Sequence, residues 1–263
     1  MKLKFLGTGT SVGVPQIGCE CPTCTSTDAR DMRRRCGAYI SYDGGGFLID
    51  TPPEMREACI EYGIKKVDAV VLTHSHMDHV AGFDDVRRFN TINGVKGEDG
   101  KIIGKPMNCY AMSETAEQMR RIFPYVKPVK NELGLYRPMI EFKNDDVFKI
   151  GPVNVTRLKV EHSFPCSGYL FEDNERKIGY ISDCHSLPDE TVEILQGVDV
   201  MILNCLRERP HPTHMNLELT IKALRKIKPK KSYTIHMCHD LSHVQWLEKL
   251  PEGTEPAYDG LEI

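Results

Sequence analysis

The residues most capable of chemistry in this sequence lie between Thr73 and His79. This segment reads Thr-His-Ser-His-Met-Asp-His and places three imidazoles and one carboxylate within six residues: His74, His76, Asp78 and His79. Imidazole and carboxylate groups are ligands of zinc and other divalent first-row metal ions. A lone histidine is usually a satisfied core or surface residue, but clustered unpaired polar groups near a core are costly. The segment therefore predicts a metal site.

An apolar run directly before this segment would position it. Residues 67–72 read Val-Asp-Ala-Val-Val-Leu, which is typical of a buried strand. Residues just after such a strand lie at the edge where open α/β sheets place their sites. His74 and His76 are two residues apart, so on extended backbone they point the same way. Asp78 and His79 follow after the chain has turned and can reach a second position, which suits two metal ions side by side.

Two metal ions need more ligands than one segment offers. Apolar, strand-like runs at 153–160, 178–182 and 233–235 are each followed by a candidate: His162, Asp183 and His236. One such residue alone would be only suggestive. Three of them repeat one pattern, an apolar strand followed by His or Asp, and this repetition predicts that they join the first segment.

The remaining pattern distributes strands and helices over both halves of the chain. Further strands are predicted at 3–6, 38–42, 47–49, 168–171 and 198–203, and helices at 50–62, 189–195, 216–227 and 242–250. Two strand-rich sheets with helices outside give a four-layer αββα sandwich of the α/β class. Because the candidate ligands come from both halves, residues 1–263 are interpreted as one domain. The polar, glycine-rich segment 90–106 is predicted to be a mobile loop near the site.

A long loop at 11–36, rich in Gly, Pro and Cys, contains a second candidate metal site. Three thiolates lie within six residues: Cys19, Cys21 and Cys24. Closed structural zinc sites take four such ligands in a tetrahedron, and spacing alone leaves the fourth open. Its candidates are Cys36, Cys238 and His239. Three free thiols in a loop are the alternative interpretation.

Composition limits the class of protein. The 263 residues include 34 Lys and Arg against 37 Asp and Glu, and the net charge of −3 disfavours a dedicated nucleic-acid binder. The N-terminus lacks a signal-peptide pattern, and no apolar run reaches the roughly 18 residues of a membrane span. We therefore expect a cytoplasmic protein without a membrane partner. Its ten cysteines are then free thiols or metal ligands rather than disulfides.

Together these motifs resemble the metallo-β-lactamase superfamily over essentially the whole chain, and Gly7-Thr8-Gly9-Thr10 and Ile49-Asp50-Thr51 match its first elements. Within the superfamily they are most similar to the PhnP-type cyclic phosphodiesterases of the carbon–phosphorus lyase pathway. This similarity rests on the cysteine cluster at 19–24, on Ser182-Asp183, on His236-Met237-Cys238-His239 and on the ending Tyr258-Asp259-Gly260-Leu261-Glu262-Ile263. The fold of this family is the four-layer αββα sandwich.

The resemblance also implies a division of the ligands. One metal ion would be held by His74, His76 and His162, the other by Asp78, His79 and His236, and Asp183 would bridge both. His239 would complete a structural zinc site with Cys19, Cys21 and Cys24. The active site would then hold two divalent cations, with zinc as the first candidate and manganese or nickel as alternatives. Asp50 is expected to orient ligands without binding metal itself.

The implied activity is hydrolysis of a small cyclic phosphodiester, such as a ribosyl 1,2-cyclic phosphate, by a hydroxide that bridges two metal ions. His214 aligns with a family histidine close to the substrate phosphate and would be the general acid or a phosphate contact. Asp78 would share in proton transfer besides binding metal. Arg207 and Arg209 are candidates for holding a terminal phosphate, and the sequence does not choose between them.

Other functions remain open at the level of sequence. A tRNA-processing nuclease like ribonuclease Z is disfavoured because the chain has no insert comparable to that family's long tRNA arm. Hydrolysis of a thioester or lactone is an alternative, since ligands at strand ends do not separate phosphorus from carbonyl chemistry. A non-catalytic carrier like PqqB would share the cysteine cluster but would not need all seven ligands. The expected partner is a small-molecule phosphodiester substrate, and a homodimer is also considered.

Overall fold

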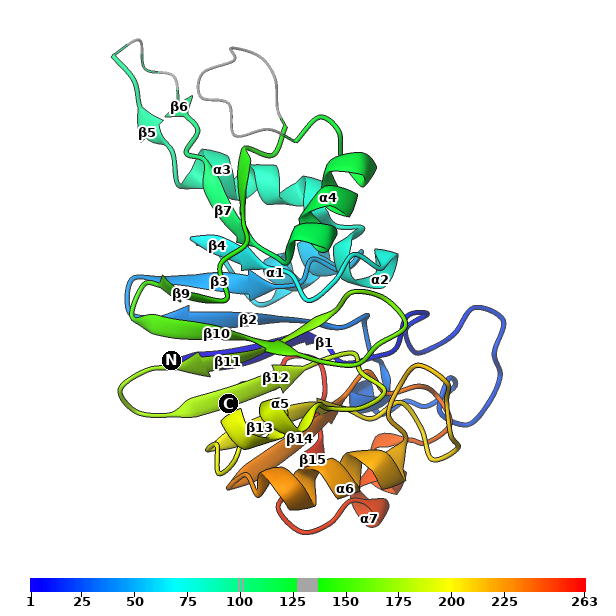
Figure 1. Ribbon diagram of the computed structural model, residues 1–263. Helices are drawn as coiled ribbons and strands as arrows, with labels where there is room; N and C mark the ends of the chain where they lie inside the picture. Colours follow the sequence, from blue (N-terminus) through cyan, green and yellow to red (C-terminus); the bar gives the residue numbers. More distant parts are fainter. Residues whose placement is uncertain (99, 101, 127–136) are drawn as a thin grey trace.

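Two β-sheets stacked face to face, with helices on both outer sides, form the body of the molecule (Figure 1). The structure is a computed structural model that describes residues 1–98, 100, 102–126 and 137–263. The first sheet contains, in spatial order, β1 (Lys2–Gly7), β2 (Gly37–Tyr42), β3 (Gly45–Ile49), β4 (Ala69–Val71), β7 (Met107–Tyr110) and β8 (Ile140–Lys143). The second contains, in spatial order, β15 (Thr254–Pro256), β14 (Lys231–Ile235), β13 (Val200–Asn204), β12 (Lys177–Ile181), β11 (Ser167–Glu172), β10 (Val153–Lys159) and β9 (Val147–Ile150). The predicted four-layer αββα fold is confirmed.

Helices cover the outer face of each sheet. The first sheet carries α1 (Met55–Glu61), α2 (Met77–Val80), α3 (Arg87–Ile92) and α4 (Ser113–Ile122). The second carries α5 (Asp189–Ile194), α6 (Leu217–Ile227) and α7 (His243–Lys249). Short 3-10 turns lie at Ala29–Asp31 and Phe83–Val86. No helix in the described part of the chain has the length and apolar character needed to cross a bilayer.

Local sequence explains α6, which follows the loop that carries His214. Asn216 caps the helix, since its side chain accepts a hydrogen bond from the Leu219 N–H at 3.1 Å. The helix ends at Lys228, whose left-handed backbone (φ 53°) stops the helical hydrogen bonds. Its buried residues recur three and four positions apart and form one apolar face against the second sheet: Thr220, Ala223, Leu224 and Ile227.

The core between the two sheets is apolar and aromatic. Phe47 of the first sheet and Phe171 of the second are both fully buried, with ring centroids 5.5 Å apart. Truncating a buried aromatic residue of this kind to alanine costs about 3–5 kcal/mol. The Tyr169 hydroxyl, also fully buried, donates to the Leu72 carbonyl at 2.7 Å. This bond joins β11 to the segment that carries His74, so the core holds the two sheets in register beside the candidate ligands.

Strand directions bring the candidate ligands to one edge of the molecule. Strands β12, β13 and β14 are parallel, and β10 runs in the same direction because β11 is antiparallel to both of its neighbours. In the first sheet β3 and β4 are parallel. The carboxyl ends of parallel strands meet at the same edge of a sheet. The loops that leave these strands therefore gather beside α2, at the right of the view in Figure 1.

The helix predicted at 50–62 begins later than expected. Asp50 has a left-handed backbone (φ 59°), and α1 starts only at Met55. The cause is Pro52-Pro53, because a proline disfavours the helical conformation of the residue before it. The irregular turn between β3 and α1 leaves the Asp50 carboxylate directed at Thr73 instead of at a helix N-terminus.

The prediction that 90–106 is a loop near the site is wrong for the described residues of that segment, and residues 99 and 101 lie outside them. The segment contains the end of α3 and a short antiparallel hairpin of β5 (Val95–Lys96) and β6 (Ile102–Ile103). β-branched residues favour this pairing. Figure 1 shows the hairpin projecting from the α3 side, far from α2 and the strand ends. The sequence did not predict nine of the described elements: β5, β6, β7, β8, β9, β15, α2, α3 and α4.

Asp259 ties the C-terminal segment to the glycine-rich turn after β1. Its carboxylate accepts hydrogen bonds from the Thr8 hydroxyl and from the Arg34 N–H, both at 2.8 Å. Burial nevertheless raises the pKa of Asp259 to about 7. The folded chain therefore binds this proton more tightly than the unfolded chain. The resulting stabilisation is full below about pH 4 and is lost as the pH rises to about 7.

Replacing Asp259 by Asn should remove this pH dependence. We compare the free energy of unfolding of the wild type with that of Asp259→Asn. The difference, wild type minus variant, should fall by up to about 4 kcal/mol between about pH 4 and about pH 7, because one pKa unit corresponds to about 1.4 kcal/mol. Urea unfolding of both proteins at several pH values measures this difference. A difference that stays constant over the range contradicts the prediction.

Candidate metal centre

Side chains from several strand ends converge at the shared edge of the two sheets. The group contains all seven residues predicted from the sequence: His74, His76, Asp78, His79, His162, Asp183 and His236. The first two follow β4, Asp78 and His79 lie on α2, and the others follow β10, β12 and β14. Strand geometry thus unites residues that are up to 162 positions apart in the chain.

His74, His76 and His162 form a first subgroup. Nε2 of His74 lies 2.9 Å from Nδ1 of His76, as expected from their two-residue spacing on extended backbone. The ligand atoms of all three residues lie within 4.8 Å of one another. Two nitrogens that bind one metal ion at 2.0–2.1 Å would lie about 2.9–3.4 Å apart. The spacing therefore fits a single cation.

A second subgroup is formed by Asp78, His79 and His236, and Asp183 lies between the two subgroups. Nε2 of His79 is 3.3 Å and Nε2 of His236 is 3.6 Å from Oδ2 of Asp78. Oδ1 of Asp183 is 3.1 Å from Nε2 of His79, and its Oδ2 is 3.2 Å from Nε2 of His236. The same Oδ2 is 4.0 Å from Nε2 of His74 in the first subgroup. Asp183 thus stands where a carboxylate could serve two cations.

The Asp50 carboxylate determines which ring nitrogen of His79, and through Thr73 which ring nitrogen of His74, faces the ligand group. Its Oδ2 lies 2.7 Å from Nδ1 of His79 and accepts that proton. The Thr73 hydroxyl donates to the same oxygen at 2.7 Å, so it can accept a proton from Nδ1 of His74 at 3.0 Å. In their neutral forms both rings then direct a bare Nε2 lone pair inward. Metal-bound histidines are commonly oriented by such outer hydrogen bonds.

Several inward-facing atoms are buried and have no hydrogen-bond partner among the described residues. They are Nε2 of His79, His162 and His236, and Oδ1 of Asp183. His162 shows the same arrangement as above, since its Nδ1 donates to the Thr213 carbonyl at 2.9 Å. A buried unsatisfied polar group costs about 1–3 kcal/mol. Two divalent cations would satisfy all of these atoms together, so the residues present fit a dinuclear metal site.

The charge state of the group also favours metal binding. Burial lowers the pKa of His74 and His76, which keeps both rings neutral near pH 7. Burial raises the pKa of Asp183, but His236 and His79 outweigh it and hold that pKa well below its usual range. Neutral imidazoles and ionised carboxylates are the forms that coordinate metal. For His79, Asp183 and Asp50 outweigh burial and raise its pKa, so metal binding there must release a proton.

Two residues of the site have backbone conformations that L-residues seldom adopt. Asp50 has φ of 59° and His236 has φ of 60°, both in the left-handed region. Each follows directly on a strand, β3 or β14. Such conformations cost about 1–3 kcal/mol and persist where the surrounding structure fixes them, often at functional sites. Here the left-handed backbone directs the His236 side chain into the ligand group. It directs the Asp50 side chain to the outer nitrogen of His79.

Replacing Asp50 by Asn should weaken metal binding without removing a ligand. The amide keeps the size of the side chain, but it cannot accept from His79 and Thr73 with a full negative charge. Loss of such an outer partner typically lowers metal affinity by about 10–100-fold. Competition with a chromophoric chelator measures this affinity. Asp43→Asn, at an exposed turn, is the matched control, and equal affinities in the two variants would refute the orienting role.

His214 lies beside Asp183, at the position predicted for an acid or phosphate contact. Its Nδ1 is 3.7 Å from Oδ2 of Asp183, and its ring centroid is 4.7 Å from that of His236. Its side chain is only 14% exposed, which excludes a freely solvated loop histidine. Burial, and then the neighbouring His236, lower the pKa of His214 to about 3. The free protein therefore presents a neutral imidazole next to the candidate ligands.

The cysteine loop forms a second cluster outside the dinuclear group. Sγ of Cys19, Cys21 and Cys24 lie 3.2 Å, 3.4 Å and 3.4 Å from Nδ1 of His239. Ligands of a tetrahedral zinc ion with Zn–S near 2.3 Å and Zn–N near 2.0–2.1 Å would be about 3.5 Å apart. The cluster contains His239 and neither Cys36 nor Cys238, the other two candidates from the sequence. The four residues fit a closed structural zinc site.

Replacing Cys21 by Ser should lower the zinc content by one ion per chain. A serine hydroxyl is a poor zinc ligand, and the loop at 11–36 would lose the clip that joins it to His239. Inductively coupled plasma mass spectrometry counts the metal. Cys59→Ala, within α1 and away from the cluster, should keep the full count. An unchanged count in Cys21→Ser would contradict the structural zinc.

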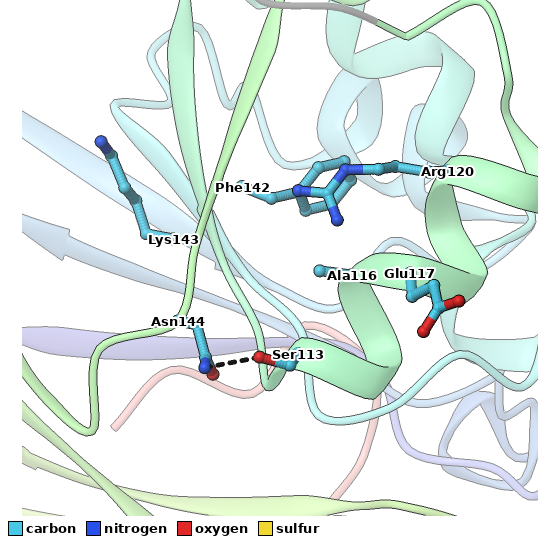
Figure 2. A pocket seen from close by; sticks show the side chains of 7 residues that line it. All are labelled: Ser113, Ala116, Glu117, Arg120, Phe142, Lys143 and Asn144. Atoms are coloured by element: carbon cyan, nitrogen blue, oxygen red, sulfur yellow. Dashed lines mark hydrogen bonds between the residues drawn. The ribbon is translucent and has the colours of Figure 1, made fainter.

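A cleft of about 330 Å³ lies between α4 and β8, away from the metal ligands. Figure 2 shows the Arg120 side chain over the Phe142 ring, with its guanidinium 5.0 Å from the ring centroid. On the other side of the cleft, the Asn144 amide donates to the Ser113 hydroxyl at 2.6 Å. The residues that line it include no candidate metal ligand, so this cleft adds nothing to the metal centre.

Comparison with known proteins identifies the class. Residues 46–237 match the family described as "Beta-lactamase superfamily domain". This range includes all seven residues of the dinuclear group. The chain therefore belongs to the metallo-β-lactamase superfamily, as the motifs predicted, and has the fold of that superfamily.

Individual relatives narrow the comparison. A solved structure described as a new diphosphatase from the PhnP family is 35% identical, with a TM-score of 0.87, and the match covers 100% of this chain and 96% of the other. This likeness confirms the predicted resemblance to the PhnP family.

An octanoyltransferase of Porphyromonas gingivalis is 32% identical over 267 residues, which is 100% of this chain and 51% of that protein. This chain thus spans about half the length of that relative. Coenzyme PQQ synthesis protein B of Methylobacterium radiotolerans is 24% identical over 234 residues, covering 78% of this chain and 72% of the other.

Proposed function

We propose that this protein is a dinuclear metal-dependent phosphodiesterase that opens a small cyclic phosphodiester. The observation that carries the proposal is the pair of inward-facing subgroups, His74/His76/His162 and Asp78/His79/His236, with Asp183 between them. The likeness to a PhnP-family diphosphatase favours a phosphorus–oxygen bond over a carbonyl as the point of attack. Zinc is the first candidate for both cations, with manganese or nickel as alternatives, and a further zinc would occupy the cysteine cluster.

The residues have separate roles in this proposal. Divalent cations held by the two subgroups would lower the pKa of a shared water to near neutrality and so supply the nucleophile. Asp50 and Thr73 keep His79 and His74 in the orientation that binding requires. Phe164 stacks on His76, with ring centroids 4.9 Å apart, so an aromatic ring flanks the first subgroup.

His214 and Asp78 handle the proton in this proposal. A phosphate anion next to His214 would favour the protonated ring, which could then donate to the leaving alkoxide. Asp78 would share in proton transfer besides binding metal, and its Oδ2 lies 3.6 Å from Nε2 of His236. Protonation of the leaving oxygen matters most for alkyl esters, because an alkoxide is a strong base.

The alternatives have less support. The net charge of −3 does not favour a tRNA substrate. The octanoyltransferase match leaves about half of that protein uncovered, so its name does not favour an acyl substrate here. A carrier like PqqB would not need seven gathered ligands, and keeping their buried atoms unpaired would only cost stability.

A substrate panel tests the proposal. Metal-loaded protein is assayed with bis-p-nitrophenyl phosphate, a 2′,3′-cyclic nucleotide, a precursor tRNA and an octanoyl thioester, each with Zn²⁺, Mn²⁺ and Ni²⁺. Cleavage of the first two in preference to the others is expected. Turnover of the thioester alone would contradict the proposal and indicate hydrolysis of an acyl substrate. No cleavage of any phosphodiester by fully metallated protein would end it.

A further inference from the structure

A short irregular segment between β14 and α7 carries one candidate ligand of each metal site. His236 belongs to the dinuclear group, and His239, three positions later, belongs to the cysteine cluster. The segment 236–241 follows β14 and precedes α7, and it begins with the left-handed backbone of His236. Hydrogen bonds from other parts of the chain must therefore fix its conformation.

Backbone groups of neighbouring segments stabilise the first half of this segment. The Met237 N–H donates to the Thr8 carbonyl, and the Thr10 N–H donates to the Met237 carbonyl, both at 3.1 Å. The Cys238 N–H donates to the Leu206 carbonyl at 2.9 Å. These bonds leave the Cys238 carbonyl to be satisfied by a side chain.

The Arg33 guanidinium satisfies two carbonyls, one on each side of His239. Its Nη1 donates to the Cys238 carbonyl at 2.8 Å, and its Nη2 donates to the Leu241 carbonyl at 3.2 Å. The same Nη2 donates to Oδ1 of Asp31 at 3.2 Å. The Arg33 side chain is fully buried, and a buried charge is costly unless it is paired and hydrogen-bonded. The guanidinium therefore acts inside the protein and not as a solvated surface charge.

Arg33 is itself fixed from two sides. Oδ1 of Asp31, which pairs with it, also accepts from the His243 N–H at the start of α7, at 2.6 Å. The Arg33 backbone exchanges two hydrogen bonds with Val14, both at 2.8 Å, within the loop that carries the three cysteines. The guanidinium thus joins that loop to the segment 236–241 through contacts that need no metal ion.

We propose that Arg33 is a positioning residue for both metal sites. Its guanidinium fixes the segment 236–241, so that His236 and His239 face their ligand groups before a metal ion binds. A preformed ligand loses less conformational freedom on binding than a mobile one, so the metal affinity of both sites should depend on Arg33. This inference goes beyond the proposed function, because it holds whichever ester is hydrolysed.

The double variant Asp31→Asn/Arg33→Met tests this role without leaving a buried charge unpaired. Replacing a buried ion pair by uncharged groups of similar size is often neutral for stability, and the Asn oxygen can still accept from His243. Cobalt(II) is titrated into chelator-treated protein. Its thiolate absorption band reports the cysteine cluster, and competition with a chromophoric chelator reports the remaining ions. Both affinities should fall by about 10–100-fold, as for the loss of other outer partners of metal ligands.

Two controls separate positioning from a general loss of stability. Glu54→Gln/Arg35→Met removes an ion pair with partly exposed side chains, two positions along the chain, and should keep both affinities. Phe171→Leu weakens the core between the sheets and should also keep them while the protein is folded. If the double variant does not fold, Arg33→Lys, which keeps the charge but not the planar fork, should show the same loss. Wild-type affinity at either site in a folded Arg33 variant would overturn the proposal and leave the proposed phosphodiesterase activity untouched.

Discussion

Replacing Asp183 by Asn is expected to abolish the hydrolytic activity of this protein. The Asp183 carboxylate reaches histidines of both subgroups: it lies 3.1 Å from His79 and 3.2 Å from His236 in one, and 4.0 Å from His74 in the other. The amide of asparagine keeps the shape of the side chain but not its negative charge. Two cations would then repel each other without a shared anion between them, so one or both should be lost.

We expect kcat/KM for a phosphodiester to fall by at least about 10³-fold in Asp183→Asn, with fewer metal ions per chain. Asp189→Asn is the matched control, because Asp189 is 87% exposed on α5 and the change in charge is the same. Metal content by mass spectrometry and steady-state kinetics on one preparation give both numbers. Wild-type activity with a full metal count in Asp183→Asn would rule out the bridging role.

The second large effect is expected at His214, where a substitution should lower activity but leave the metal content unchanged. His214 lies 3.7 Å from Asp183 and is not one of the seven predicted ligands, so its removal leaves those seven in place. Replacing it by Ala should lower turnover of a 2′,3′-cyclic nucleotide by about 10²–10⁴-fold without loss of metal. Turnover of bis-p-nitrophenyl phosphate should fall far less, because p-nitrophenolate leaves without needing a proton.

The two esters distinguish the roles of His214. A large loss for the cyclic nucleotide alone supports the general acid, since a merely structural defect would slow both esters. An equal loss for both supports a phosphate contact, which acts on the group that the two substrates share. Wild-type turnover of both esters in His214→Ala would refute either role.

Sequence patterns predicted which residues meet in the candidate metal centre because these residues obey two local rules. His74 and His76 alternate on extended backbone, and His162, Asp183 and His236 each follow an apolar strand. Parallel strands end at one edge, so residues far apart in the chain meet there without any further information. The likeness to a known family supplied what spacing alone left open, as for His239 in place of Cys36 or Cys238.

Other features depend on contacts that local sequence does not encode. Strands β7 and β8 have only four residues each, too few for a clear periodic signal. The Thr213 carbonyl orients His162 through a contact 51 positions away, and a backbone group leaves no trace in composition. Arg207 and Arg209 have the same chemistry and lie two positions apart, so only burial and partners separate them.

The turn at Asp50, where the backbone is left-handed, shows both what the sequence predicted and what it missed. Pro52-Pro53 was interpreted as the start of a helix, whereas in the structure both prolines lie in the irregular turn between β3 and α1. The result is a carboxylate that holds both Thr73 and His79. Asp50 was predicted to orient ligands, but Thr73 as the link to His74 was not. The only sequence signal for this role of Thr73 is a hydroxyl next to a candidate ligand at a strand end.

A metal titration of chelator-treated protein tests the central claim most directly. Metal is added back in equivalents per chain, while bound metal and hydrolysis of bis-p-nitrophenyl phosphate are followed together. The proposal predicts no turnover without metal, one equivalent taken up by the cysteine cluster without activity, and activity that rises with two further equivalents. Full turnover by metal-free protein, or activity complete with a single equivalent bound outside the histidine group, would contradict a dinuclear phosphodiesterase.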